Sequence, residues 1–344
     1  MALNSAGEAG GRRLAVVIPA YRQRHLPQVL ESLRAQTDRR FRVYVGDDAS
    51  PDELKPVIDR HSAGLDVVYR RFEENRGGRD LVAQWDRCIQ LSEGESWIWL
   101  FSDDDVAGPD CVASFYREIE GGVGATALLR FDHDVIDDAG AVIERPQAHP
   151  ASETGEELLV AMLQKNTARR WRAPDHLFLR SAYVESGGFV SFPKALNSDW
   201  ATWILFAQPG GVRTLAGAKI QWRKHAQGIS TGKLAGFQRE WVVAQVEFLK
   251  WVNAHVARHY PHRTTEVGGL ARAHFLKGMH RLQPPPGLGQ VGEHSRLAAP
   301  LWGGGSGRCA AWLAWYVLRT QVRNWPVLRA IAGRRAGVKQ PEGN

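Results

Sequence analysis

The chain is poor in cysteine, and its 3 cysteines among 344 residues form no C-x-x-C pair. An odd, scattered set of thiols supplies neither a disulfide framework nor the paired spacing of a structural zinc site. The sequence therefore predicts a protein of the reducing cytoplasm.

The sequence also lacks a long apolar run. No stretch reaches the roughly 20 apolar residues that cross a bilayer, and residues 1–13 are polar and rich in glycine, unlike a signal peptide. Neither a zinc-finger spacing nor an RNA-binding aromatic motif is present, so we expect no nucleic-acid partner. The net charge of +7 and the pI near 9.5 instead suit a phosphorylated substrate or an anionic membrane surface.

What the sequence does have is a regular alternation of short apolar runs and helical spacings. The runs predict strands at 14–18, 41–45, 67–69 and 97–101. Apolar residues at helical intervals predict helices at 25–36, 52–61 and 80–91. This order predicts an α/β fold with a mostly parallel sheet and helices on both faces. Pro19 is expected to stop the first strand.

The remainder of the chain is less regular in pattern. Between 125 and 221 we expect a turn at 187–189, a short helix at 199–206 and a strand at 219–222. A long helix is expected at 236–259, and its apolar face contains Trp241, Val242, Val246, Leu249 and Val252. An arginine-rich amphipathic helix is expected at 312–331, interrupted by Pro326.

Polar residues follow three of the predicted strands, at 19–21, 47–48 and 103–105. The carboxyl ends of parallel strands share the edge of a sheet where ligands bind. The three consecutive aspartates at 103–105 repel one another unless they share a cation, and their oxygens suit Mg2+ or Mn2+. The alternative is a solvated turn that caps the helix opened by Pro109.

The turn after the first strand argues against a dinucleotide-binding site. Such a site needs a glycine-rich turn there, whereas this chain has Pro19, Ala20 and Tyr21. A diphosphate would then lack a glycine cradle and would need a metal to balance its charge. The aspartate cluster could hold that metal, which indicates a nucleoside diphosphate site of another type.

Together these motifs resemble the family 2 glycosyltransferases of the GT-A fold. The resemblance rests, in chain order, on residues 16–21, 46–52, 75–78, 97–109, 187–189, 199–200 and 223–225. It covers about residues 14 to 230 and implies a GT-A catalytic domain at 12–235, with a nucleotide-sugar half at 12–110 and an acceptor half at 111–235. A helical extension would then occupy 236–344.

The resemblance implies an inverting transfer of a sugar from a nucleoside diphosphate sugar to an acceptor hydroxyl. The donor diphosphate requires Mn2+ or Mg2+ as a cofactor, and the hydroxyl requires a general base on the opposite side. The acceptor would be a glycan or a lipid-linked glycan, in the synthesis of a cell-surface polysaccharide or glycolipid.

The resemblance also assigns donor-side roles. Pro19 and Tyr21 would line the nucleotide pocket, with Tyr21 against the base. Asp48 would accept a hydrogen bond from the base edge, or else cap a turn. Asp103 would contact the ribose. Arg79 would contact a phosphate or the base, or else be an exposed ion-pairing residue.

On the metal and acceptor side, Asp104 would be the principal metal ligand and His225 would complete the metal or diphosphate site, unless it is only a surface residue. Asp105 would support them or cap the helix. Asp199 would be the general base, although it also suits a helix cap. Ser102 departs from the family pattern, because it replaces the first aspartate of the Asp-x-Asp motif and leaves one fewer carboxylate.

Sugar contacts are further expected from four other residues: Asp175, His176, Trp200 and Trp222. The two tryptophans suit core packing as well.

Two other functions remain open. A sugar nucleotidyltransferase would need a glycine-rich, basic loop after the first strand, which this chain lacks. A catalytically silent glycan- or nucleotide-binding module would have no use for both Asp104 and Asp199. For the arginine-rich segment at 312–331 we expect a peripheral membrane contact at the inner face of the cell membrane, unless it packs on the catalytic domain.

Overall fold

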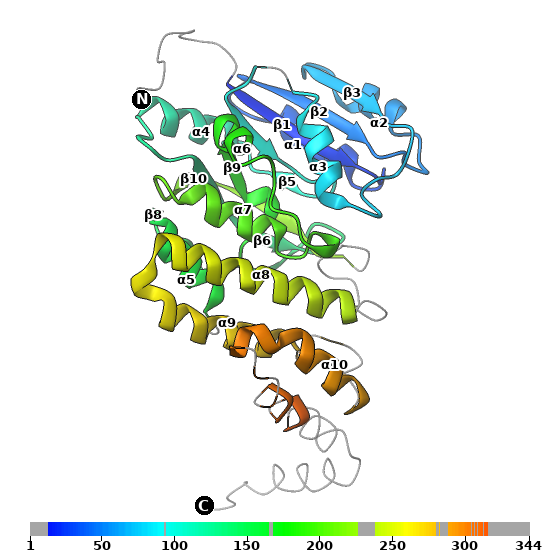
Figure 1. Ribbon diagram of the computed structural model, residues 1–344. Helices are drawn as coiled ribbons and strands as arrows, with labels where there is room; N and C mark the ends of the chain where they lie inside the picture. Colours follow the sequence, from blue (N-terminus) through cyan, green and yellow to red (C-terminus); the bar gives the residue numbers. More distant parts are fainter. Residues whose placement is uncertain are drawn as a thin grey trace, which may run out of the picture. The chain divides into compact units, whose positions relative to one another are not determined.

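The computed structural model describes residues 13–315, except 93, 165–167, 226–237, 280–281, 283–287, 304, 306, 308 and 312. It divides into two compact units, residues 1–232 and 233–344 (Figure 1). The arginine-rich helix expected at 312–331 lies outside the described residues, apart from positions 313–315.

One sheet forms the centre of the first unit, and its described strands run in the order β3-β2-β1-β4-β9-β6-β10-β5. Its first four strands are β1 (Leu14–Ala20), β2 (Phe41–Asp47), β3 (Val67–Arg71) and β4 (Trp97–Leu100), all mutually parallel where they pair. The others are β5 (Val106–Ala107), β6 (Leu128–Ile136), β7 (Val142–Glu144), β8 (Ser152–Glu153), β9 (His176–Leu179) and β10 (Val212–Arg223). The longest ladders, β1 with β2 and β6 with β10, are parallel.

Helices cover both faces of this sheet. The buried faces of α1 (Leu26–Arg34), α2 (Leu54–His61) and α4 (Cys111–Glu120) share one apolar core with Leu14, Val16 and Ile18 of β1. Successive strand side chains point to opposite faces, so Ala15 and Val17 face away from that core. Helix α3 (Leu81–Ile89) packs against β1, β2 and β4 outside that core. The predicted α/β architecture is therefore confirmed.

The prediction that Pro19 stops the first strand is wrong, because β1 continues to Ala20. Val17 accepts a hydrogen bond from Phe101 beside β4, whereas Ala20 accepts one from Asp48 beside β2. Alternate residues thus face opposite neighbours, and Pro19 faces the β4 side. Pairing with β4 ends at Val17, so the missing N–H of Pro19 has no ladder partner to lose.

The short helix predicted at 199–206 and the strand predicted at 219–222 are both confirmed, but the region from 125 to 221 contains further elements that the sequence pattern did not predict. This region contains β6 through β10 together with α5 (Gly155–Leu163), α6 (Arg180–Glu185) and α7 (Ser198–Ala207). Helix α5 begins with a capping box, in which the side chains of Thr154 and Glu157 bind each other's backbone N–H groups. In this region β9 pairs antiparallel with both of its neighbours, and β10 contains a bulge. The regular alternation of strand and helix that identifies the first half is therefore absent from this region.

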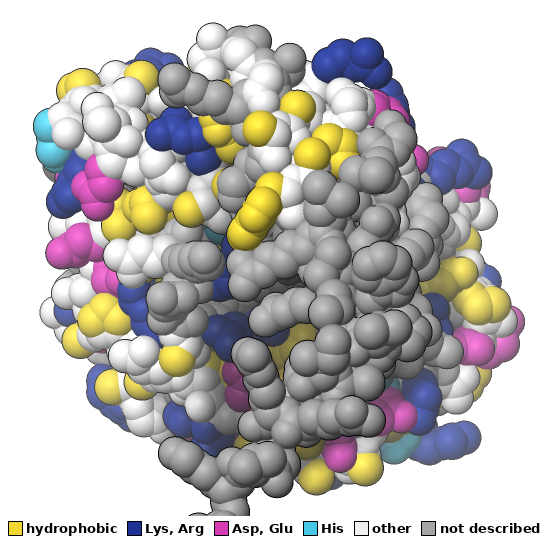
Figure 2. All heavy atoms as spheres, turned by 90° about the horizontal axis from the view of Figure 1, so that it is seen from below, with side chains coloured by type: hydrophobic (Ala, Val, Ile, Leu, Met, Phe, Trp, Pro, Cys, Tyr) yellow, Lys and Arg dark blue, Asp and Glu magenta, His cyan; other side chains and the backbone are white. Residues whose placement is uncertain are grey.

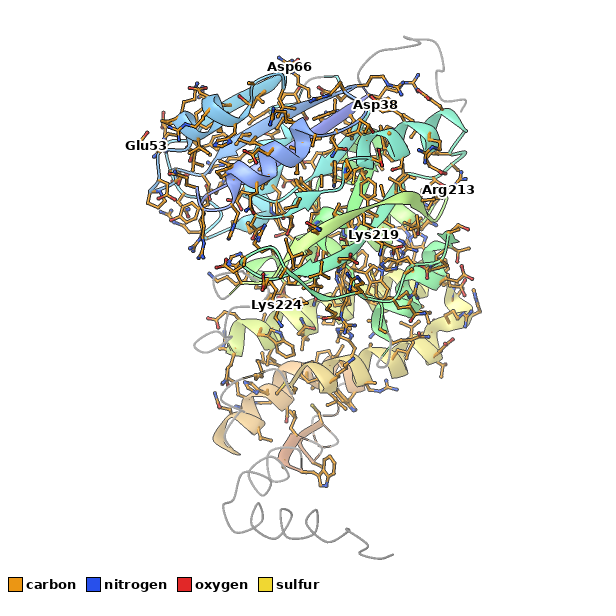
Figure 3. The ribbon with its side chains drawn as sticks, turned by 180° about the vertical axis from the view of Figure 1, so that it is seen from behind. Asp38, Glu53, Asp66, Arg213, Lys219 and Lys224 are labelled. Atoms are coloured by element: carbon orange, nitrogen blue, oxygen red, sulfur yellow. The ribbon has the colours of Figure 1, made fainter. Side chains whose placement is uncertain are left out.

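The residues at the amino ends of the strands differ from those at the carboxyl ends, and Figure 3 labels several of them. Asp38 and Asp66 precede β2 and β3, so they belong to the amino edge of these strands. Glu53 follows β2, and Lys224 follows β10, at the carboxyl edge. The aspartates at 103–105 and 47–48 also follow strands, so the candidate site lies at the carboxyl edge.

The second unit is helical, with α8 (Gln238–His259), α9 (Thr264–Met279) and α10 (Leu288–Ala298). The apolar face expected for the long helix at 236–259 is confirmed as buried along α8. Trp241 of α8 lies near Phe275 of α9, with 6.4 Å between the ring centroids. None of the helices in the described part of the chain is both long and apolar enough to cross a bilayer.

Candidate active site at the carboxyl edge of the sheet

The turn after β4 gives each of its aspartates a different partner. The Asp103 carboxylate accepts the backbone N–H groups of Tyr21 and Arg22, at 2.8 Å and 3.0 Å. Burial, and next the charge of Asp104, raise the pKa of Asp103 to about 6. Asp103 thereby ties the turn after β4 to the loop after β1.

Asp105 is fully buried and accepts the backbone N–H of Arg223 at 2.7 Å. Burial and the neighbouring Asp104 charge raise its pKa well above the usual range. The Arg223 side chain donates to the Asp104 carbonyl at 2.8 Å and to Gln28 Oε1 at 2.7 Å. It also reaches the carbonyls at positions 137 and 138. Arg223 therefore fixes the aspartate turn from the end of β10, a role that sequence reasoning missed.

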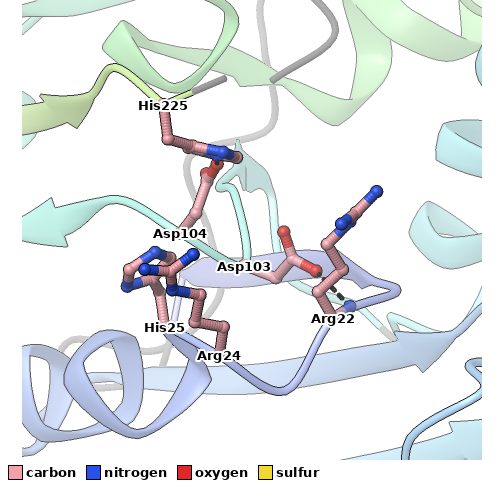
Figure 4. A pocket seen from close by; sticks show the side chains of 6 residues that line it. All are labelled: Arg22, Arg24, His25, Asp103, Asp104 and His225. Carbon is pink, nitrogen blue, oxygen red and sulfur yellow. Dashed lines mark hydrogen bonds and ion pairs between the residues drawn. The ribbon is translucent and has the colours of Figure 1, made fainter. Parts of the chain in front are cut away.

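Asp104 and His225 line a small pocket and contact each other directly, with 2.8 Å between Asp104 Oδ2 and His225 Nε2. Figure 4 shows the lining side chains, which are Arg22, Arg24, His25, Asp103, Asp104 and His225. Three of them were predicted as site residues. Arg22, Arg24 and His25 were not, although their close spacing directly after an apolar strand was a usable signal.

The donor atoms in this pocket fit a divalent ion that is completed by its substrate. No group of three or more His, Cys, Asp or Glu side chains with metal-binding geometry occurs among the described residues. Asp104 and His225 nevertheless bring one oxygen and one nitrogen together. Mg2+ and similar ions are commonly held by one or two protein groups plus substrate phosphates and water.

Asp48 is buried and organises the loop between β3 and α3. Its carboxylate accepts the backbone N–H groups of Arg76 at 2.7 Å and Gly77 at 2.8 Å, and it forms an ion pair with Arg87. A Cβ at position 77 would lie 2.7 Å from Asp48 Oδ2, so only glycine permits this approach. The predicted contact of Asp48 with a nucleotide base stays a prediction.

The other donor-side residues lie around the same edge. Pro19 is half-buried at the end of β1, and Tyr21 is 37% exposed in the loop that follows. The Tyr21 carbonyl accepts the Ser50 hydroxyl at 2.7 Å, which joins the loops after β1 and β2. Arg79 is exposed on the loop before α3. Tyr21 thus offers an accessible ring beside the pocket that Asp103 lines.

Asp199 lies in the first turn of α7, where Asn197 is the N-cap residue, and its carboxylate accepts the backbone N–H of Trp200 in the same turn, so the alternative that it caps the helix stays open beside its role as a base. Burial raises the pKa of Asp199 to about 6, although Trp200 N–H and the Arg172 charge oppose the shift. Asp199 does not line the pocket of Asp104 and His225. Its function as a base stays a prediction.

The backbone before Asp199 is strained. Among the described non-glycine residues, only Ala49, Lys194, Ala195 and Asn197 have positive φ angles. Three of the four precede Asp199, and Ala49 directly follows Asp48. Such conformations cost about 1–3 kcal/mol each and concentrate at functional sites.

The expected sugar contacts of Asp175 and His176 are wrong. Asp175 and His176 are completely buried, so neither offers surface to a sugar. His133 is paired with Asp175 and lowers the pKa of that carboxyl, against the effect of burial, while His176 stacks on Trp203 with 4.8 Å between centroids. Asp175 and His176 therefore belong to the buried interior of the first unit.

Trp200 and Trp222 are partly exposed and have ordinary packing partners. The Trp200 ring lies 5.8 Å from that of Trp171, and the Arg172 guanidinium lies 3.8 Å above the Trp222 ring. These contacts leave their predicted role toward sugars untested.

The chain is similar in sequence to known glycosyltransferases. Residues 15–175 match the family model described as glycosyl transferase family 2. A curated protein of Haemophilus influenzae, described as an uncharacterized glycosyltransferase, is 30% identical over 108 residues, which are 31% of this chain and 34% of that protein. The chain thus spans about a third of the length of that relative.

Solved structures show the same fold. The structure of S. aureus TarS 1-349 in complex with UDP has a TM-score of 0.61 at 13% identity, over 96% of this chain and 94% of that chain. The Pyrobaculum calidifontis mannosyltransferase PcManGT, in complex with GDP-Man and Mn2+, has a TM-score of 0.50 at 15% identity, over 95% and 85%. The predicted GT-A fold is confirmed by these similarities.

Proposed function

Because residues 15–175 match the glycosyl transferase family 2 model, we propose that this protein transfers a sugar from a nucleoside diphosphate sugar to an acceptor hydroxyl, with inversion at the anomeric carbon. The observation that carries the proposal is the pocket at the carboxyl edge of the sheet. There Asp104 and His225 lie beside Arg22 and Arg24, which suits a charged diphosphate together with a cation.

Asp104 and His225 would hold a divalent ion, and Asp103 would contact the ribose of the donor. Mn2+ is favoured over Mg2+, because an imidazole nitrogen is softer than the oxygen ligands that Mg2+ prefers. When bound, the ion supplies positive charge that stabilises the diphosphate leaving group. The arginines of the loop after β1 would add further positive charge at the same pocket.

The nucleotide would lie along the loops after β1 and β2. Tyr21 would stack on the base, Pro19 would line the pocket wall, and Asp48 would contact the base edge while it holds the loop at 75–77. Arg79 would reach a phosphate or the base from the exposed side of that loop.

Asp199 would accept the proton of the attacking hydroxyl. A pKa of about 6 keeps its carboxylate ionised at neutral pH, and it makes the group a stronger base than an ordinary aspartate. Arg172 contributes an opposing positive charge nearby, while the negative charge of Asp175 supports the upward shift.

Binding of nucleoside diphosphates tests this proposal directly. A thermal-shift series with UDP and GDP, each with and without Mn2+, should raise the unfolding temperature most when Mn2+ is present. UDP and GDP are the appropriate probes, because TarS and PcManGT are solved with UDP and GDP-Man respectively. Absence of any shift with every combination would contradict the proposal.

Activity assays on the same purified protein can distinguish a glycosyltransferase from a sugar nucleotidyltransferase and from a binding module without catalytic activity. Release of the nucleoside diphosphate from a sugar nucleotide should be slow with water alone, and it should accelerate when a glycan acceptor is added because the sugar is then transferred to the acceptor. A nucleotidyltransferase would instead consume a nucleoside triphosphate, and a binding module would bind the nucleotide without turnover.

We further propose a glycan or lipid-linked acceptor in cell-surface polysaccharide or glycolipid synthesis, reached through a peripheral membrane contact of the segment at 312–331. On the face drawn in Figure 2, the described basic and acidic side chains are interspersed. Co-sedimentation with anionic vesicles should favour the full chain over a chain that ends before Leu301. Equal partitioning of the two proteins at low salt would contradict this part of the proposal.

A further inference from the structure

Three consecutive residues of α3 contact both sides of the candidate site. Arg87 forms an ion pair with Asp48 and donates a hydrogen bond to the Glu74 carbonyl at 2.9 Å. Its guanidinium also lies 3.9 Å above the Phe72 ring and bonds Gln84. The side chains of Arg87 and Asp48 are only 14% and 5% exposed, so this ion pair is shielded from solvent.

The preceding residue, Asp86, holds the acceptor-side turn at 187–189. Tyr183 donates its hydroxyl to Asp86 Oδ1 at 2.7 Å, and the Phe189 backbone N–H is a second donor to this carboxylate. Gly188 has a φ of +99°, and a Cβ there would lie 3.4 Å from Asp86 Oδ1. The turn therefore fits closely against the Asp86 carboxylate.

Trp85 supports the same turn through Phe189, with 5.3 Å between the ring centroids. Phe189 in turn packs against Trp203 of α7, at 5.6 Å. The chain that follows is tied to α7 by hydrogen bonds, from Val190 N–H to Thr202 Oγ1 and from Phe192 N–H to Ser198 Oγ, both at 3.0 Å. Contacts thus run without a break from α3 to the first turn of the helix that carries Asp199.

Successive residues of a helix point about 100° apart, since 3.6 residues complete a turn. Residues 85 to 87 can therefore engage two separate segments from one rigid element. One segment carries the loop that Asp48 organises, and the other leads to Asp199.

We propose that α3 is a coupling element between the donor site and the general base, and that Arg87 is the positioning residue on its donor side. This inference rests on the proposed function. Arg87 fixes Asp48 and the loop at 74–77, while Trp85 and Asp86 fix the turn at 187–189. Occupation of the donor site then stabilises α3, and through it the segment before Asp199.

The proposed role of Arg87 at the donor site is tested by measuring the nucleotide affinity of the Arg87→Gln variant. UDP and GDP, each with Mn2+, should bind about 10- to 100-fold more weakly, as is typical when a residue that orients a ligand is removed. Arg87→Lys should recover only part of this loss, because an ammonium cannot serve Asp48 and Glu74 with the planar geometry of a guanidinium.

Arg42→Gln is the matched control. Arg42 also forms an ion pair on a partly buried side chain, with Asp66 at 3.2 Å, but at the start of β2. The Arg42→Gln variant should lose this more exposed ion pair without a change in nucleotide affinity. Thermal unfolding without nucleotide checks that all variants are folded.

The coupling itself is tested by hydrogen–deuterium exchange with and without nucleotide. In the wild type, nucleotide with Mn2+ should slow exchange in the loop at 74–78 and in the segment at 187–192. The Asp86→Asn variant should lose the slowed exchange in the segment at 187–192. Its nucleotide affinity should change less than about threefold, because residue 86 does not contact Asp48.

The outcomes separate this inference from the proposed function. A wild type that binds neither nucleotide overturns both. Normal binding by Arg87→Gln, or protection of 74–78 without any protection of 187–192 in the wild type, overturns the coupling and leaves the proposed function intact.

Discussion

The two halves of the sheet position their candidate residues by different means. In the donor half, β1, β2, β3 and β4 are parallel, and the carboxylates come directly from strand ends. Backbone N–H groups of neighbouring loops then bind Asp48 and Asp103. In the acceptor half, Asp199 lies on a helix that follows three residues with positive φ. The donor site is thus built by strand topology, whereas the base is held by a strained segment.

This difference indicates where each half can tolerate change. A strand end is fixed by many ladder hydrogen bonds, so a single loop substitution leaves it in place. A strained segment persists only while its surroundings hold it. Four predictions test the contrast, from the largest expected effect to the smallest.

Asp199→Asn should retain donor binding and lose sugar transfer by about 10²- to 10⁴-fold, because an amide cannot accept the proton. Steady-state rates and nucleotide affinities measured on the same preparation would show the separation. In the wild type, kcat should rise as the pH passes about 6 and then level off, because Asp199 must be ionised. A loss below about tenfold at saturating substrates would assign the base to another group.

Asp104→Ala should weaken Mn2+-dependent nucleotide binding by at least about tenfold and leave the fold intact, because it removes the principal oxygen ligand. Calorimetry with UDP or GDP and Mn2+ measures the effect. Asp110→Ala is the control, since this carboxylate lies on the same chain segment but bonds Thr37. Normal Mn2+-dependent binding by the first variant would show that the metal assignment is wrong.

Asp199→Asn should also be more stable than the wild type, by about 1–2 kcal/mol near pH 8, after allowance for partial exposure. Folding raises this pKa from 3.8 to about 6, so the stability that the group contributes is complete below 3.8 and is lost as the pH rises through 6. Urea unfolding at a series of pH values should show the advantage of the variant growing between about pH 4 and pH 6. An equal stability of both proteins at all pH values would mean that Asp199 is not desolvated.

Ala195→Gly should raise stability by up to about 1 kcal/mol, because glycine adopts a positive φ without steric strain. If the strained segment holds Asp199, this variant should also lose kcat with little change in donor affinity. Ala49→Gly is the matched change beside Asp48, and it should alter nucleotide affinity instead. If both variants lost kcat with little change in donor affinity, the two halves of the sheet would not position their residues by different means.

The donor half could be predicted from the sequence because its pattern is local. Apolar strands, helical spacings and polar strand ends identified β1 to β4 and placed Asp103, Asp104 and the loop of Tyr21 at one edge. The acceptor half depends on long-range pairing, which a single sequence does not display. Strand β9 enters the sheet antiparallel between β4 and β6, and no local spacing predicts that position.

Within the site, the sequence indicated residue types better than contacts. His225 was predicted beside the metal site, and its Nε2 lies 2.8 Å from Asp104. Arg223 and Arg87 were missed, because an arginine that binds backbone carbonyls or a buried carboxylate looks like any other charged residue in the sequence. Asp175 and His176 were misplaced for a related reason, since a buried ion pair and a ligand contact use the same residue types.

The anchoring of the aspartate turn by Arg223 has a consequence for folding during synthesis. Arg223 bonds Asp104 and Asp105 across 119 and 118 positions of the chain. Domains tend to fold as the chain emerges from the ribosome, beginning with its N-terminal part. The parallel strands of the donor half can therefore pair early, while the Asp105 carboxylate and the Asp104 carbonyl still lack the hydrogen-bond donors that Arg223 supplies. A nascent chain truncated before β10 should keep this turn open to solvent and to proteases until residue 223 has emerged.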